Sequence, residues 1–178
     1  TLLQGNVDAI YFNEKLYIGK REEVFVYNES TGNFDLYYHL AGKDITLSCL
    51  HLDENKNLWM GTPSNGLYCL SADKTISQPV PRGNIASIYE DSSKELWICT
   101  WEEGLYRIKT DSTIENFRHD PKNPNSICTD FVRSCCEDNA GNLWIGTFHG
   151  LNRYEKSTGK FQLYTANANK PDGLTHSS

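Results

Sequence analysis

Apolar residues in this chain fall in short runs broken by turn-forming residues, and they lack the spacing of three to four that marks an amphipathic helix. The clearest stretch predicts four strands, at 131–136, 143–147, 151–154 and 161–164. Asp, Asn, Ser and Gly gather between these segments, where tight turns are expected. No part of this stretch predicts a helix of useful length. The pattern therefore indicates an all-β protein.

The same pattern recurs around three tryptophans, each six residues after an aspartate: Asp53 and Trp59, Asp91 and Trp97, Asp138 and Trp144. A weaker copy is centred on Tyr17. Positions 17, 59, 97 and 144 are 42, 38 and 47 residues apart. A repeat of this length is typical of a four-stranded propeller blade. The repeated Trp residues are then expected to pack one blade against the next.

The predicted fold class is all-β, a β-propeller with about four four-stranded blades of a larger, seven-bladed ring. We expect the blades at 7–44, 45–84, 85–126 and 127–166, followed by 167–178 as a loop toward a next blade. Both ends support this division, because 5–11 resembles 83–89 and 167–174 resembles 120–127. The chain is therefore expected to be part of a longer array of blades.

The last copy reads Asp-x-x-Gly-Asn-Leu-Trp-Ile-Gly-Thr, then Gly-Leu-Asn-Arg-Tyr, then Thr-Gly-Lys-Phe. Together with Asp-Pro-Lys-Asn-Pro-Asn-Ser-Ile at 120–127, these motifs resemble two-component regulator propeller repeats. The resemblance spans the four copies and is weakest in the first. There Asn13-Glu-Lys shortens the turn and Lys20 replaces Thr. Cys99 also stands where the other copies have Gly.

This resemblance implies the periplasmic sensor region of a membrane-bound hybrid histidine kinase, of the type found in Bacteroidetes. Such a segment would detect oligosaccharides from complex glycans and control transcription of glycan-use genes. It would perform no chemistry, with the kinase activity outside this chain, and would need no cofactor. The implied partners are an oligosaccharide, the missing blades of the same chain and a second receptor copy in a homodimer.

Composition narrows the partners further. The 178 residues carry 17 basic and 23 acidic side chains, a formal charge of −6, which argues against binding nucleic acid or an anionic membrane surface. The apolar runs are far shorter than the roughly 20 residues of a membrane-spanning helix. No basic region followed by an apolar one opens the chain, so we expect no targeting segment within it.

The recurring aspartates have two interpretations. Three acids at one repeat position could form a metal or catalytic array, but an Asp that heads a tight turn hydrogen-bonds its own backbone. We expect turn chemistry at Asp53, Asp91 and Asp138. The five histidines are scattered, without the close spacing of a metal site. No metal site is therefore predicted.

The six cysteines are Cys49, Cys69, Cys99, Cys128, Cys135 and Cys136. None forms a Cys-x-x-Cys pair, and their spacing does not suggest a disulfide framework. Cys135 aligns with Leu50 and Ile88 and is expected to be a small buried apolar residue. We expect mostly free thiols, although a periplasmic location would permit disulfides.

The loops between the second and third strands vary among the copies and are the candidate ligand-binding region. Sugar rings present apolar faces that stack on flat side chains, and their hydroxyls need polar partners. The candidate stacking residues are Trp101, Phe148 and His149, and the candidate polar residues are Glu102, Glu103, Asn65 and Arg133. Trp101 is the one Trp outside the repeat position. Alternatively, Trp101 packs against a neighbouring blade.

Two other functions remain open on the sequence. A propeller lyase or hydrolase of the streptogramin lyase type would need a His and Glu pair over the central channel, with His149 as the candidate histidine. A purely structural propeller would bind nothing at its loops. Because propellers carry many functions, the fold does not choose among these.

Overall fold

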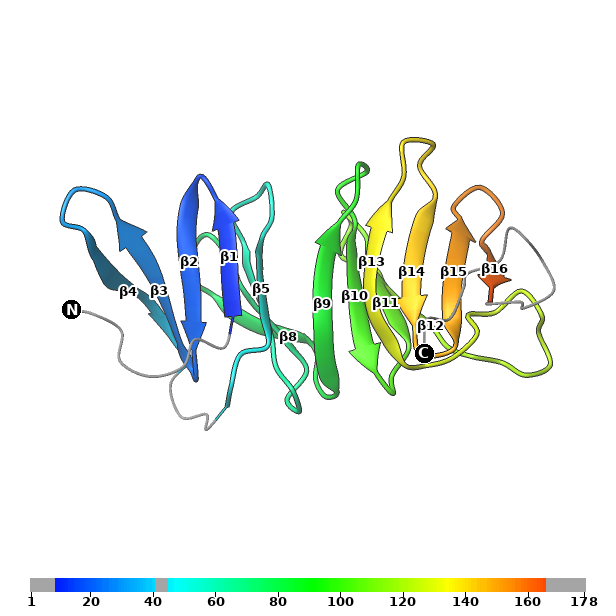
Figure 1. The fold of residues 1–178 in the computed structure, drawn as a ribbon. Helices are drawn as coiled ribbons and strands as arrows, with labels where there is room; N and C mark the ends of the chain where they lie inside the picture. The colour runs from blue at the N-terminus through cyan, green and yellow to red at the C-terminus, as the bar shows by residue number, and fades with distance from the viewer. Residues whose placement is uncertain (1–8, 41–44, 166–178) are drawn as a thin grey trace, which may run out of the picture. The chain divides into compact units, whose positions relative to one another are not determined.

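The computed structural model describes residues 9–40 and 45–165 and contains sixteen strands in that part of the chain. They form four antiparallel four-stranded sheets, each built from consecutive strands in chain order (Figure 1). This confirms the predicted all-β class and the four strands of each repeat. The described residues include no helix long and apolar enough to cross a membrane.

Unit 1 comprises residues 1–88. Its sheet 1 contains β1 (Ala9–Asn13), β2 (Lys15–Lys20), β3 (Glu23–Asn28) and β4 (Asn33–His39). Its sheet 2 contains β5 (Cys49–Leu52), β6 (Leu58–Gly61), β7 (Leu67–Leu70) and β8 (Ile76–Val80). The core of this unit joins residues of both sheets and of the segment between them: Tyr17, Val24, Leu40, Ile45, Leu47, Leu50, Leu52, Leu58, Met60, Tyr68 and Leu70.

Unit 2 comprises residues 89–178, and the boundary falls within β9 (Asn84–Glu90). Sheet 3 continues from β9 with β10 (Leu96–Trp101), β11 (Leu105–Ile108) and β12 (Ile114–Phe117). Sheet 4 contains β13 (Val132–Glu137), β14 (Leu143–Thr147), β15 (Gly150–Glu155) and β16 (Lys160–Tyr164). Residues buried in this unit include Trp97, Ile98, Leu105, Val132, Leu143, Ile145, Tyr154 and Phe161.

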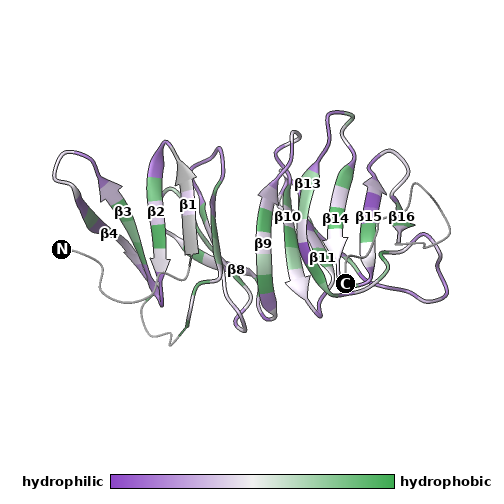
Figure 2. Ribbon diagram, in the orientation of Figure 1, coloured by the Kyte–Doolittle hydropathy of each residue, from purple (hydrophilic) through white to green (hydrophobic). Residues whose placement is uncertain are grey.

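The strands of the last copy lie close to their predicted places. The prediction 143–147 coincides with β14, whereas β13 begins one residue later than the predicted 131. Figure 2 shows hydrophobic colour on strands such as β2, β9 and β14 and hydrophilic colour toward the turns. The predicted limits of whole blades include the connecting loops and stay predictions.

The recurring Asp and Trp form one contact in three sheets. The indole Nε1–H of Trp59, Trp97 and Trp144 donates to the carboxylate Oδ2 six residues earlier, at 2.9, 2.8 and 2.7 Å. The other carboxylate oxygen accepts the backbone N–H four residues on, at 2.8 to 3.0 Å. Each aspartate thus closes its turn and also fixes a packed ring. The indole bond is a role that turn chemistry alone does not predict.

Candidate functional site

Three loop segments meet in unit 2 at the end of β10. Trp101 closes β10 and forms an isolated antiparallel bridge with Phe131, which precedes β13. The backbone N–H of Phe148, in the loop between β14 and β15, donates to the Phe131 carbonyl at 3.2 Å. The segment before β13 is therefore held between the β10–β11 loop and the β14–β15 loop.

The three aromatic rings of these segments form a surface that we call the aromatic platform: Trp101, Phe131 and Phe148. The Trp101 and Phe148 ring centroids are 5.3 Å apart, and those of Phe131 and Phe148 are 6.1 Å apart. Phe148 is 58% exposed and Phe131 is 38% exposed, while Trp101 is half-buried. Such edge-to-face contacts fix the ring orientations while leaving apolar surface in water.

Arg133, on β13, places its guanidinium beside the platform. Its central carbon lies 5.2 Å from the centre of the Trp101 ring and 5.7 Å from that of Phe148. A cation at this distance is attracted to the negative face of an aromatic ring. Arg133 is exposed and brings hydrogen-bond donors to the edge of the apolar surface.

Glu102 follows Trp101 in a strained backbone conformation. Its φ of 87° lies in the left-handed region, which costs a non-glycine residue about 1 kcal/mol or more. The Asp130 carbonyl accepts the N–H groups of Glu102 at 3.2 Å and of Gly104 at 3.0 Å, which holds this loop in place. Among the described residues no hydrogen bond or ion pair engages the exposed Glu102 carboxylate, which is therefore an available acceptor next to the platform.

Glu103 belongs to an ion-pair network that holds the loops together. Arg118 donates to the Glu103 carboxylate at 2.5 Å and to Asp130 Oδ2 at 2.7 and 3.0 Å. The other Asp130 oxygen accepts the backbone N–H of His119 at 2.7 Å. Burial alone would lower the pKa of Arg118, but its bonds to Asp130 and Glu103 raise it above its ordinary value. Glu103 therefore stabilises the loop through Arg118.

The structure thus brings together Trp101, Glu102, Phe148 and Arg133, and it assigns Glu103 to the network with Arg118. His149 is exposed beside Phe148, and its backbone N–H donates to the Thr147 hydroxyl. Asn65 lies in unit 1, where its backbone carbonyl accepts from the Gln78 amide at 2.6 Å. Because Asn65 belongs to the other unit, the structure does not place it relative to the aromatic platform.

Sequence reasoning placed Phe131 in a strand and missed it as a candidate binding residue. Aligned by the repeat, Phe131 corresponds to Thr46 and Asn84, so an aromatic ring at this position is peculiar to the last copy. This difference among the copies is the sequence signal that could have identified Phe131 as a candidate binding residue. Asp130 and Arg118 carried no such signal, because their contact depends on how the two ends of the connection between β12 and β13 approach each other.

Among the described residues, no three His, Cys, Asp or Glu side chains are placed to hold a metal ion. The six cysteines are not joined in disulfides. Cys135 is expected to be buried, and the residue as a whole is half-buried. Its thiol forms a hydrogen bond with the thiol of Cys99. The hydrogen bond with Cys99, followed by burial, raises the pKa of Cys135 well above its usual value. The Cys135 thiol is therefore a weak nucleophile.

Two segments of the chain, residues 79–102 and 126–149, match the family described as two component regulator propeller. The segments contain the Asp and Trp turns of sheets 3 and 4. These two segments are therefore similar to two-component regulator propeller repeats. None of the curated proteins matches it significantly.

Solved structures share the fold. The extracellular domain of a hybrid two component system from B. thetaiotaomicron is 24% identical, with a TM-score of 0.69, over 89% of this chain and 22% of that one. A virginiamycin B lyase from Staphylococcus aureus is 17% identical, with a TM-score of 0.69, over 92% and 56%. A protein of unknown function from Bacteroides caccae is 10% identical, with a TM-score of 0.60, over 97% and 65%. The chain thus has a propeller fold and spans less than two thirds of each of these chains.

Proposed function

We propose that this chain is part of the periplasmic ligand-sensing propeller of a membrane-bound hybrid histidine kinase. In this proposal the aromatic platform binds an oligosaccharide from a complex glycan. Binding shifts the population of two arrangements of a homodimeric receptor and so controls transcription of glycan-use genes. The kinase activity lies outside this chain, and further blades complete the propeller.

The observation that carries the proposal is the exposed platform of Trp101, Phe131 and Phe148, with Arg133 at its edge. Solvent-exposed aromatic rings held in fixed orientation cost free energy in water and mark a binding surface. The repeats and the fold shared with an extracellular sensor domain support a sensor in which such a surface meets a ligand outside the cell.

The chemistry of the platform suits a sugar. The apolar faces of the rings can stack on the C–H faces of a pyranose, while the Glu102 carboxylate accepts from its hydroxyls. Arg133 supplies donors for hydroxyl, carboxylate or sulfate oxygens. A small number of polar groups around an apolar surface is typical of a small-molecule site.

Isothermal titration of the chain with a panel of neutral and acidic oligosaccharides tests this proposal. At least one glycan is expected to bind, and Trp101→Ala or Phe148→Ala should weaken its binding about tenfold or more. Ile76→Ala is the matched control, because Ile76 is an exposed apolar residue of unit 1. No heat with any glycan, or unchanged affinity in Trp101→Ala, would contradict the proposal.

The described residues give little support to the alternative function of a propeller lyase. It expects a His and Glu pair at His149, but among the described residues His149 forms no ion pair, whereas His39 and Glu23 lie 3.7 Å apart in sheet 1. The likeness to a lyase is a likeness of fold at 17% identity. Incubation with a streptogramin B antibiotic is expected to leave the compound intact by mass spectrometry.

A further inference from the structure

Two cysteines of unit 2 meet where sheets 3 and 4 pack together. Cys99 lies on β10 and Cys135 lies on β13, and their thiols are hydrogen-bonded to each other. Cys99 is fully buried, and Cys135 is half-buried as a residue. Trp97, two residues before Cys99 and so on the same face of β10, packs on Tyr154 of sheet 4 at 5.4 Å. The Cys99 side chain therefore points to the junction of the two sheets.

The strands that carry these cysteines also approach each other through their backbones. Trp101, two residues after Cys99, forms an isolated antiparallel bridge with Phe131, four residues before Cys135. The Cα atoms of such bridged residues lie about 4.5 to 5.5 Å apart. A disulfide joins residues whose Cα atoms are about 4.4 to 6.8 Å apart. Beside the two cysteines, the chain thus brings β10 and β13 to the separation that a disulfide spans.

Both cysteines depart from the repeat. Glycine occupies the positions equivalent to Cys99, and large aliphatic residues occupy those equivalent to Cys135: Gly19, Gly61 and Gly146, and Leu50 and Ile88. A small and a large residue are thus replaced by two residues of intermediate size, which packing alone can explain. Packing does not require sulfur at both positions. Two cysteines in contact, at positions where no other copy has cysteine, indicate chemistry between them.

The neighbouring cysteine of β13 is placed differently. Cys136 follows Cys135 directly and is exposed, so its side chain points to the other face of the strand. Cys128, in the loop before β13, accepts a hydrogen bond at its sulfur from the Asn152 amide at 3.0 Å. These two residues are therefore internal controls for any bond between Cys99 and Cys135.

We propose that Cys99 and Cys135 form a disulfide that joins β10 to β13 when the chain folds in an oxidising compartment. The oxidant is a second disulfide, carried by a small thiol compound or by a disulfide-exchange protein. One cysteine attacks it and forms a mixed disulfide, which the other cysteine then displaces. Two cysteine S–H bonds and the S–S bond of the oxidant break, while one protein S–S bond and two S–H bonds of the reduced oxidant form. Atoms and electrons therefore balance.

The oxidising compartment rests on the periplasmic location in the proposed function, because disulfides persist there and not in the cytosol. The chemistry itself needs only the oxidant. The bond closes a loop with 35 residues between the two cysteines. It also ties together the strands that carry Trp101 and Arg133, which lie two residues from Cys99 and from Cys135.

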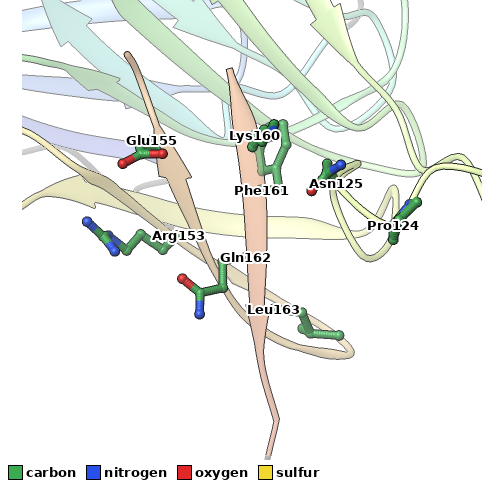
Figure 3. Close-up of a pocket in the computed structure, with 8 residues that line it drawn as sticks. All are labelled: Pro124, Asn125, Arg153, Glu155, Lys160, Phe161, Gln162 and Leu163. Carbon is green, nitrogen blue, oxygen red and sulfur yellow. The ribbon is translucent and has the colours of Figure 1, made fainter. Parts of the chain in front are cut away.

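The disulfide forms before the sheets are fully packed. In the folded chain, the hydrogen bond with Cys99, followed by burial, raises the pKa of Cys135 well above its ordinary value, so little thiolate is present. A cavity of about 420 Å³ in unit 2 does not expose the pair, because it is lined by residues 124–125, 153, 155 and 160–163. Figure 3 shows these side chains on β15, on β16 and on the loop before β13. An oxidant therefore reaches the thiols during folding more readily than afterwards.

Folding the reduced 178-residue chain in a mixture of oxidised and reduced glutathione tests the proposal. After alkylation of free thiols, trypsin places Cys99 in peptide 95–107 and Cys135 in peptide 134–153. Mass spectrometry of the unreduced digest is expected to find these two peptides linked in most of the chain. The link should be about tenfold or more as abundant as any link to peptide 123–133, which contains Cys128.

Two serine variants assign the bond, because peptide 134–153 contains Cys136 as well as Cys135. Cys136→Ser should retain the link, whereas Cys135→Ser should lose it. The unchanged chain and Cys136→Ser should have a urea midpoint about 1 M or more higher when oxidised than when reduced, because a cross-link restricts the unfolded chain. Cys135→Ser should have the same midpoint in both conditions.

Recovery of alkylated Cys99 from the folded, oxidised chain overturns the proposal, and so does loss of the link in Cys136→Ser. Circular dichroism shows that each protein is folded. The peptide map is made on the unchanged protein, so it holds even where Cys135→Ser fails to fold. No oligosaccharide enters the experiment, so its outcome is separate from that of the proposed ligand site.

Discussion

At the scale of single residues, Lys156 ties two carboxylates of neighbouring sheets together. Its ammonium donates to Asp91 at 2.8 Å and to Glu137 at 2.6 Å. Burial would raise the pKa of both acids, but hydrogen bonds from Lys156, with Trp97 for Asp91 and Ser92 for Glu137, hold each pKa below its ordinary value. A lowered folded-state pKa contributes stability above the ordinary value, and that stability is lost as the pH falls.

We therefore expect Lys156→Met to lower the free energy of unfolding by about 2 kcal/mol at neutral pH. The difference from the wild type should shrink as the pH falls below about 4, because both acids become protonated. Urea unfolding at neutral and acidic pH measures this. Lys160→Met, at the exposed first position of β16, is the control. A loss independent of pH would show that Lys156 acts through packing of its stem.

Residue roles could be predicted where they depend on local chemistry and not where they depend on contacts between segments. The turn role of Asp91 follows from its place in the repeat, and the structure adds the indole bond of Trp97. Trp101 and Phe148 stood out because they break the repeat. The Arg118 network could not be predicted, since it joins both ends of the long connection between β12 and β13, at Arg118 and Asp130, to Glu103 of the β10–β11 loop.

At the scale of elements, Gly104 allows the loop after Trp101 to pass close to the end of β12. It has a φ of +78°, and a Cβ there would lie 2.3 Å from the Phe117 carbonyl oxygen. Gly104→Ala should therefore cost about 3 kcal/mol or more, because positive φ and a backbone clash add. Gly159, with a φ of +70° and open space around it, should lose only about 1 kcal/mol on the same change.

Chemical denaturation of the two glycine variants measures both losses. Equal losses would mean that backbone strain alone is responsible and that the loop can move away from β12.

The hairpins themselves were predictable from turn residues and apolar runs, which is why 143–147 coincides with β14. The close approach of Gly104 to β12 was not predictable from the sequence, because it depends on the path of a strand that comes later in the chain.

At the scale of the whole molecule, the aromatic platform takes its residues from sheets 3 and 4 and from the loop between them. Ligand sites of propellers are concave and gather loops from several blades, and this chain spans only 22% of the extracellular domain to which it is similar. We therefore infer that these loops supply part of a binding surface. The apolar stacking contributed by Trp101 should be present in the short chain, while contacts from further blades should not.

A longer polypeptide that extends this chain with its neighbouring repeats is accordingly expected to bind the same oligosaccharide about tenfold or more tightly than the 178-residue chain, because additional loops contact the sugar. Trp101→Ala should weaken binding by a similar factor in both, since the stacking contact is common to them. Titration of both chain lengths with one glycan, each as the unchanged protein and as Trp101→Ala, measures the gain in affinity with length and the loss on substitution. If Trp101→Ala affected only the short chain, the platform would be a surface that further blades cover, and Trp101 would be a packing residue of the complete propeller.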